Sequence, residues 1–187
     1  MTIKDDDVRL LVRQAVSRVL AEKAAASDAP AAPLAAQKVI ALGADHGGFA
    51  LKQDLANYLR ELGYALNDCG AFSPDPVDYP DIAYAVAKLV SDGAAWRGIV
   101  IDGAGIGSAM VANKVPGVRA ALCYDLSTAR NAREHNDANV LTLGARLIGL
   151  GLARDIVKTF LDTDCTEERH KKRVAKIMDV ERRYLRK

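Results

Sequence analysis

An aspartate followed by a glycine-rich loop is the part of this chain best suited to do chemistry. The apolar run Gly98–Ile101 ends at Asp102, and glycine then recurs at every second position before a predicted helix over 108–114. A strand, a glycine-rich turn and a helix N-terminus together present backbone N–H groups to an anion or a developing oxyanion. Asp102 follows its strand, where open α/β sheets bind their ligands. We therefore expect an oxyanion-binding loop with a reactive carboxylate.

Two other interpretations of this loop stay open. The run Gly103-Ala104-Gly105-x-x-Ser108 falls one residue short of GxGxxG, and Asp125 follows about twenty residues later, as in a dinucleotide site. Against a dinucleotide, the loop follows a middle strand and Asp102 would face a pyrophosphate of like charge. The glycines could also serve only a tight turn that needs positive φ.

Further polar residues stand at the ends of other predicted elements. Asp45 and His46 follow the first strand, and glycines flank the pair. They should therefore reach the same sheet edge as Asp102. His135 lies in a polar run between a helix and a strand, where it could also only cap the helix C-terminus. Arg169 and Arg173 are one helical turn apart and could close on one phosphate, although a solvated charged face explains them almost as well.

Composition bounds the class of protein. The 187 residues are 50% hydrophobic and carry a net charge of +2, which indicates one cored domain plus an appendage. Basic clusters near the C-terminus favour a solvated helix face over nucleic-acid binding. Three cysteines without CxxC spacing predict neither disulfides nor zinc, and Cys69 and Cys123 are expected to be buried. With no secretory signal and no apolar run long enough to span a membrane, we expect a cytoplasmic protein.

The N-terminal segment has a different pattern from the rest. Apolar side chains recur on one face of a predicted helix within residues 1–21, and an Ala/Pro-rich linker covers 22–37. The stripe could dock on its own domain or on a second subunit. Binding at a membrane surface is poorly supported, because the stripe lacks aromatic residues. Capture in a partner's groove is the third option, and the arrangement resembles the encapsulation peptides that direct enzymes into bacterial microcompartments.

From residue 38 onward, strands and helices alternate. This pattern predicts a three-layer α/β/α, Rossmann-like fold with a five-stranded parallel sheet in a domain over 38–187. Strands are expected at 39–43, 64–68, 98–101, 118–123 and 140–143, with helices at 49–62, 82–90, 108–114, 126–134, 148–161 and 167–184. The last helix has little apolar surface for its own core, so we expect it to pack on another subunit.

Six ordered motifs resemble those of the type B ribose-5-phosphate isomerase family, which also contains the galactose-6-phosphate isomerase subunits. The matching segments are 43–49, 78–80, 103–107 with 112–114, 134–137, 143–146 and 169–173. The resemblance spans residues 38 to about 183 and leaves the N-terminal 37 residues outside. It implies aldose–ketose isomerisation of a sugar phosphate without metal or other cofactor. It also implies a homodimer, or a dimer of dimers, whose active sites are shared across the subunit interface.

The resemblance also implies a role for each matching residue. Arg169 and Arg173 would hold the phosphate with help from His46 and Arg146, and His135 would open the furanose ring. Asp45 and Asn136 would bind sugar hydroxyls, and Tyr79 would line the pocket. The enediolate would be stabilised by backbone N–H groups of the loop, at Gly103, Gly105 and Gly107.

The chain departs from the family pattern at the residue expected to act as the catalytic base. Many members carry cysteine where this chain has Asp102, others carry glutamate at the position of Ser108, and the frequent threonine is Ala104 here. Proton transfer between C2 and C1 needs a base near the enediolate, and a carboxylate can serve. Three outcomes follow. Asp102 is the base of the usual reaction, the substrate is a different sugar phosphate, or the site binds a sugar phosphate without isomerising it.

Overall fold

The computed structural model describes residues 37–185. The amphipathic helix predicted within residues 1–21 and nearly all of the predicted linker lie outside the described residues. No helix in the described part of the chain is long and apolar enough to cross a membrane.

Five parallel strands form the sheet, as predicted. They are β1 (Val39–Ala44), β2 (Ala65–Asp68), β3 (Arg97–Asp102), β4 (Ala120–Leu122) and β5 (Val140–Gly144), in the order β2-β1-β3-β5-β4. The three central strands are almost continuously buried, as expected for apolar strands covered by helices on both faces. The chain leaves β1 toward β2 on one side and returns to β3 on the other. A ligand site is therefore expected beyond the carboxyl ends of β1 and β3.

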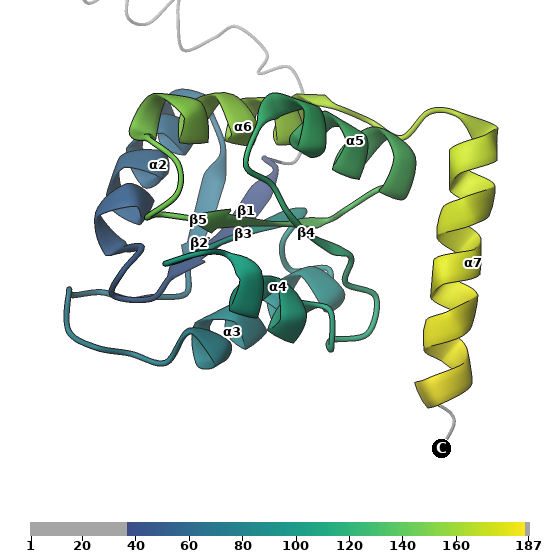
Figure 1. The fold of residues 1–187 in the computed structure, drawn as a ribbon, viewed down its shortest axis with the longest axis horizontal. Coiled ribbons are helices and arrows are strands. Elements are labelled where there is room, and N and C mark those ends of the chain that lie inside the picture. The colour runs from purple at the N-terminus through teal and green to yellow at the C-terminus, as the bar shows by residue number, and fades with distance from the viewer. Residues whose placement is uncertain (1–36, 186–187) are drawn as a thin grey trace, which may run out of the picture. The chain divides into compact units, whose positions relative to one another are not determined.

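Helices cover both faces of this sheet and complete the three layers (Figure 1). On one face lie α2 (Phe49–Glu61), α5 (Leu126–Asn136) and α6 (Leu150–Asp162), and on the other lie α3 (Tyr79–Ser91) and α4 (Ile106–Ala112). Each face has its own apolar core, one around Leu42, Ile101 and Phe160, the other around Val86 and Val100. The α/β/α class predicted from the sequence is confirmed.

Two helices begin earlier than predicted, and both changes affect the site. Helix α3 begins at Tyr79, not at residue 82, because Pro80 is tolerated in a first turn where backbone N–H groups have no helical partner. Helix α4 begins at Ile106, directly after Gly105, which has a φ of +78°. As a result, Tyr79 and Ile106, which the sequence predicts in loops, lie in the first turn of a helix.

Helix α7 (Glu168–Leu185) stands beyond the β4 edge of the sheet (Figure 1). It contacts α5 of the same chain, and His170 is its only fully buried residue. Its apolar side chains Ile177 and Val180 are 46% and 52% exposed.

Candidate active site

The carboxylate of Asp102 holds the glycine loop together. Its Oδ1 accepts hydrogen bonds from the backbone N–H groups of Ala104, at 2.8 Å, and of Gly105. Its Oδ2 accepts two from Ser108, one from the backbone N–H at 3.1 Å and one from the hydroxyl. Asp102 is 5% exposed and Ser108 is fully buried. The aspartate at the end of β3 is therefore an acceptor for four donors of its own loop.

These bonds decide which loop N–H groups are left for a ligand. The N–H groups of Ala104, Gly105 and Ser108 point to Asp102. Those of Gly103, Ile106 and Gly107 have no acceptor among residues 37–185. Two of the three free donors belong to the first turn of α4, where N–H groups lack helical partners. A developing oxyanion can therefore meet donors at Gly103 and Gly107, whereas the Gly105 N–H is occupied.

The loop after β1 lies against the same place. Asp45, 8% exposed, accepts a hydrogen bond of 2.9 Å from the N–H of Gly48, and the exposed His46 accepts one of 3.4 Å at Nδ1 from the N–H of Val77. Glycine at position 48 allows a close approach to β3, because a Cβ there would lie 2.6 Å from the carbonyl oxygen of Ile101. Asp45 and His46 are thus brought to the edge that carries Asp102.

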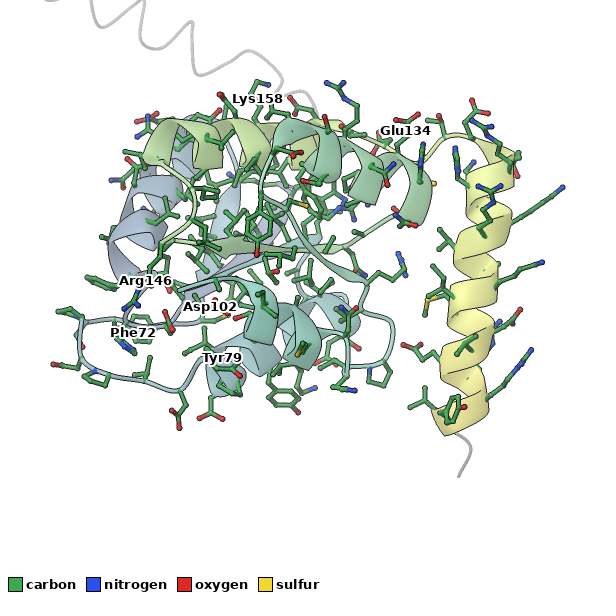
Figure 2. All side chains as sticks on the ribbon, viewed as in Figure 1. Phe72, Tyr79, Asp102, Glu134, Arg146 and Lys158 are labelled. Atoms are coloured by element: carbon green, nitrogen blue, oxygen red, sulfur yellow. The ribbon has the colours of Figure 1, made fainter. Side chains whose placement is uncertain are left out.

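Two further predicted site residues flank the glycine loop. A Cβ on Gly107 would lie 2.5 Å from the ring of Tyr79, so that this ring rests on the loop backbone. The Arg146 N–H donates to the carbonyl of Gly103 at 3.1 Å, and its side chain also passes beside Gly103. Figure 2 shows Asp102, Tyr79 and Arg146 at one end of the domain. The structure therefore gathers Asp45, His46, Tyr79, Asp102 and Arg146 around one loop.

The remaining predicted residues form a second group near α7. His135 lies at the end of α5, where its Nδ1 is 2.9 Å from the amide nitrogen of Asn131. Asn136 ends the same helix, and Arg169 and Arg173 are exposed on α7. Glu134, next to His135, lies near α7 and far from Arg146 in Figure 2. Within one chain the structure does not bring the second group to the Asp102 loop.

The second group is organised by a residue that the sequence analysis did not single out. The rings of His135 and His170 stack with centroids 4.1 Å apart and planes 15° apart. His170 is 2% exposed, and neither of its ring nitrogens has a hydrogen-bond partner in the described chain. Burial, and then the proximity of His135, lower the pKa of His170 below 6.5. His170 was read as part of a solvated basic cluster, but its ring is buried against α5.

Ser108 and Phe72 were also not predicted as site residues. The sequence indicates Ser108 as the last residue of a GxGxxG-like run and as the place of a missing glutamate, but its contact with Asp102 depends on the helix that begins two residues before it. Phe72 is 76% exposed and lies at the end of the domain that carries Tyr79 (Figure 2). Nothing in its spacing could have indicated this position, because the intervening chain is an irregular loop.

Cys69 and Cys123 are not nucleophiles or bases of the Asp102 loop. Cys123 is fully buried, as predicted, and Cys69 is partly buried. Burial raises the pKa of each thiol to about 11, so both stay protonated near neutral pH. Neither sulfur is a hydrogen-bond partner of the Asp102 loop. Asp102 is therefore the ionisable side chain that stands at this end of β3.

Comparison with known proteins agrees with this geometry. The ribose/galactose isomerase family matches residues 40–177. The chain is 42% identical to ribose-5-phosphate isomerase B of Escherichia coli, over 78% of this chain and 98% of that protein. It is 44% identical to D-erythrulose-4-phosphate isomerase of Pectobacterium atrosepticum, over 67% and 83%. The solved ribose-5-phosphate isomerase B of Clostridium thermocellum superposes with a TM-score of 0.77 at 49% identity, covering 78% and 99%. The chain therefore belongs to the ribose/galactose isomerase family and is a sugar phosphate isomerase.

Proposed function

We propose that the protein interconverts an aldose phosphate and a ketose phosphate of the ribose 5-phosphate to ribulose 5-phosphate type, with Asp102 as the base. One observation carries this proposal. A buried carboxylate stands at the end of β3, where it is flanked by Asp45 and by a loop with free N–H donors at Gly103 and Gly107. A base beside oxyanion donors is what proton transfer next to a carbonyl requires.

The proposed reaction starts with ring opening by His135. Asp102 then takes the proton from C2 of the open-chain aldose, and the electron pair of the broken C–H bond forms the C1–C2 double bond of a cis-enediolate. The negative charge develops on O1, where the N–H groups of Gly103 and Gly107 can stabilise it. Asp102 returns its proton to C1 while the O2 hydroxyl passes its proton to O1, and the ketose results. Asp45 and Asn136 bind sugar hydroxyls, and Tyr79 lines the pocket.

The phosphate end of the site is proposed to come from a second copy of the chain. Arg169 and Arg173, with His46 and Arg146, would hold the phosphate, and guanidinium groups suit its oxygens. The second group lies far from the loop of its own chain, as Glu134 and Arg146 show (Figure 2). Exposed apolar residues on α4, such as Met110 at 64%, and on α7, such as Ile177, supply surface for a dimer contact. Each site would then combine the Asp102 loop of one subunit with His135, Asn136, Arg169 and Arg173 of the other.

The length of the sugar is the open part of the substrate. The E. coli relative is named for ribose 5-phosphate and the Pectobacterium relative for D-erythrulose 4-phosphate. The test is a panel of four-, five- and six-carbon aldose and ketose phosphates with the purified full-length protein. We expect the highest kcat/KM for the five-carbon pair. Isomerisation of only four- or six-carbon sugar phosphates would refute the five-carbon substrate but would still support aldose–ketose isomerisation.

One observation favours a second candidate, a sugar-phosphate-binding protein that does not isomerise. Asp102 is engaged by four donors of its own loop, as a purely structural aspartate would be. The same panel separates the two functions. Binding of a sugar phosphate without any conversion, and without exchange of its C2 proton, would establish the second.

For residues 5–21 we propose a sorting role in bacterial microcompartments. The support is the sequence: an apolar stripe that includes Leu11, Val12 and Val16, followed by an Ala/Pro-rich linker. Residues 1–37 fused to a fluorescent protein should form foci in cells that assemble such compartments. Val12→Asp should disperse the foci, whereas Gln14→Asp on the opposite face should not. Diffuse fluorescence from the unchanged fusion would reject sorting.

A further inference from the structure

A cavity of about 510 Å³ lies between α7 and the body of the domain, and the proposed reaction does not use it. One wall consists of apolar α7 side chains, and the rest is charged apart from Cys165. The lining residues are Arg97, Arg133, Asp137, Asp164, Cys165, Lys171, Val174, Ala175 and Met178. We call it the Arg97 cavity. It includes neither the Asp102 loop nor Arg169 and Arg173.

Arg97 is the unusual member of this lining. Its Nε is buried and has no hydrogen-bond acceptor, and no carboxylate lies within 4.0 Å of its guanidinium in the part of the chain that the structure describes. Its one hydrogen bond, of 3.1 Å, goes from Nη1 to the carbonyl of Trp96. Burial, and then the nearby charge of Arg133, lower its pKa to about 10, so the side chain is still a cation near neutral pH. A partly buried cation without a counterion is costly, and so is the buried Nε–H of Arg97 without an acceptor.

The neighbouring carboxylates are engaged with other cations. Asp137 binds Arg133 through Oδ1 at 2.7 Å and Arg119 through Oδ2 at 3.0 Å. Asp164 lies 3.9 Å from Arg133. Lys171 pairs with Glu168 at 2.9 Å. Four cations therefore face three carboxylates, and the cation left without a carboxylate is Arg97, whose guanidinium lies over the Trp96 ring, 4.5 Å from its centroid.

We propose that the Arg97 cavity is a second ligand site, which binds a small organic molecule through an oxyanion group, a phosphate ester or a carboxylate, placed on the guanidinium of Arg97. The planar fork of arginine matches both kinds of oxyanion. Lys171 at the rim adds positive charge, and Val174, Ala175 and Met178 contact the apolar part of the ligand. The volume is within the range of small-molecule sites.

The test is calorimetric titration of the full-length protein with inorganic phosphate and, separately, with succinate. To isolate the second site, the titrations are repeated in Arg173→Gln, which weakens the proposed phosphate grip of the active site. We expect binding of at least one of the two anions to persist in Arg173→Gln. Arg97→Gln should weaken that binding about tenfold or more, because it removes the charged fork. Arg130→Gln, an exposed arginine outside the cavity, is the matched control and should bind as the wild type does.

A second variant keeps the test decisive if Arg97→Gln does not fold. Lys171 is half exposed, so Lys171→Glu should fold normally and still repel an anion from the cavity. Equal anion binding by wild type, Arg97→Gln and Lys171→Glu would overturn the proposal, as would binding of neither anion. Loss of all binding in Arg173→Gln would overturn it as well. If instead Arg173 does not hold the phosphate in the active site, Arg173→Gln should bind the anion as the wild type does, while Arg97→Gln should still lose anion binding. That result would refute the role of Arg173 and keep the second site.

Discussion

The hydroxyl of Ser108 donates a hydrogen bond to Oδ2 of Asp102, and both side chains are buried. The backbone N–H of Ser108 donates to the same oxygen at 3.1 Å. The resemblance to the family implies a glutamate at position 108 in some relatives and a cysteine at position 102 in many. We therefore propose that this pair supplies the base as one carboxylate and one hydroxyl that holds it.

The first prediction is that Ser108 positions Asp102 for proton transfer. Ser108→Ala removes one of the two bonds to Oδ2 and should lower kcat by about 10- to 100-fold with little change in KM, because one hydrogen bond to a charged group is worth about 1.5–3 kcal/mol. Ser108→Thr keeps the hydroxyl and should restore much of the rate. Steady-state kinetics on the three proteins decide the matter. Equal kcat for the alanine variant and the wild type would exclude a positioning role.

The second prediction concerns the shared active site. Asp102→Asn and Arg173→Ala should each be nearly inactive alone, because each removes an essential group from every site. When the two variants are unfolded together and refolded as a mixture, half of the dimers are mixed, and each mixed dimer has one intact site. The mixture should therefore regain about a quarter of the wild-type activity. If the mixture stays as inactive as its components, Asp102 and Arg173 do not act across a subunit interface.

The third prediction tests the packing of β5 against the glycine loop. A Cβ on Gly144 would lie 2.7 Å from the carbonyl oxygen of Ala104, a backbone atom that cannot move without the loop. Gly144→Ala should therefore destabilise the protein by about 1–3 kcal/mol and displace the loop, lowering kcat. The matched control is Gly151→Ala in helix α6, where a Cβ meets nothing within 4 Å. It should raise stability by up to about 1 kcal/mol. Urea unfolding and kcat measure both effects, and equal results for the two variants would refute the account of the loop.

The fourth prediction follows from the buried ring of His170. Its pKa in the folded protein lies below the unfolded value of 6.5, so the unfolded chain binds more protons as the pH falls through that range. This group therefore lowers the free energy of unfolding as the pH drops below about 6.5 and has no such effect above it. The urea midpoint of the wild type should fall more between pH 7.5 and pH 5.5 than that of His170→Gln. An identical fall in both proteins would show that the stacked pair is not the source.

The sheet was predictable because its signals are local. Each central strand is an apolar run bounded by glycine or charge, and alternation with helices requires parallel pairing. The ends of strands were predictable for the same reason, and Asp45, Asp102 and Arg146 all follow central strands. Helix starts were less predictable, since Pro80 was read as part of a loop although it lies in the first turn of α3.

Other parts of the site depend on tertiary contacts that spacing does not reveal. The bond between Ser108 and Asp102 needs a turn with positive φ at Gly105, and the burial of His170 needs α7 to lie against α5. The separation of His135 from the Asp102 loop follows from chain direction, because α5 ends just before β5 begins beside Gly98 at the start of β3, whereas Asp102 is the last residue of β3. The charge imbalance at Arg97 also has no sequence signature, because the other charged residues of its cavity are 36 (Arg133) to 74 (Lys171) residues away in the chain.

The central claim is that Asp102 moves the proton between C2 and C1. Asp102→Asn keeps the size of the side chain: the amide oxygen can still accept from Ala104 and Gly105, the Ser108 hydroxyl can turn to accept from the amide nitrogen, and only the Ser108 backbone N–H loses its acceptor. Proton NMR in D₂O follows both the conversion of ribose 5-phosphate and the exchange of its C2 hydrogen. Calorimetric binding of the sugar phosphate to the variant serves as the control for an intact site.

Wild-type protein should isomerise the sugar and exchange the C2 hydrogen. Asp102→Asn should bind the sugar phosphate but lose at least about 100-fold in both rates, as expected when a general base is removed. Exchange by Asp102→Asn at the wild-type rate would contradict the account, because the carboxylate would then not be the base.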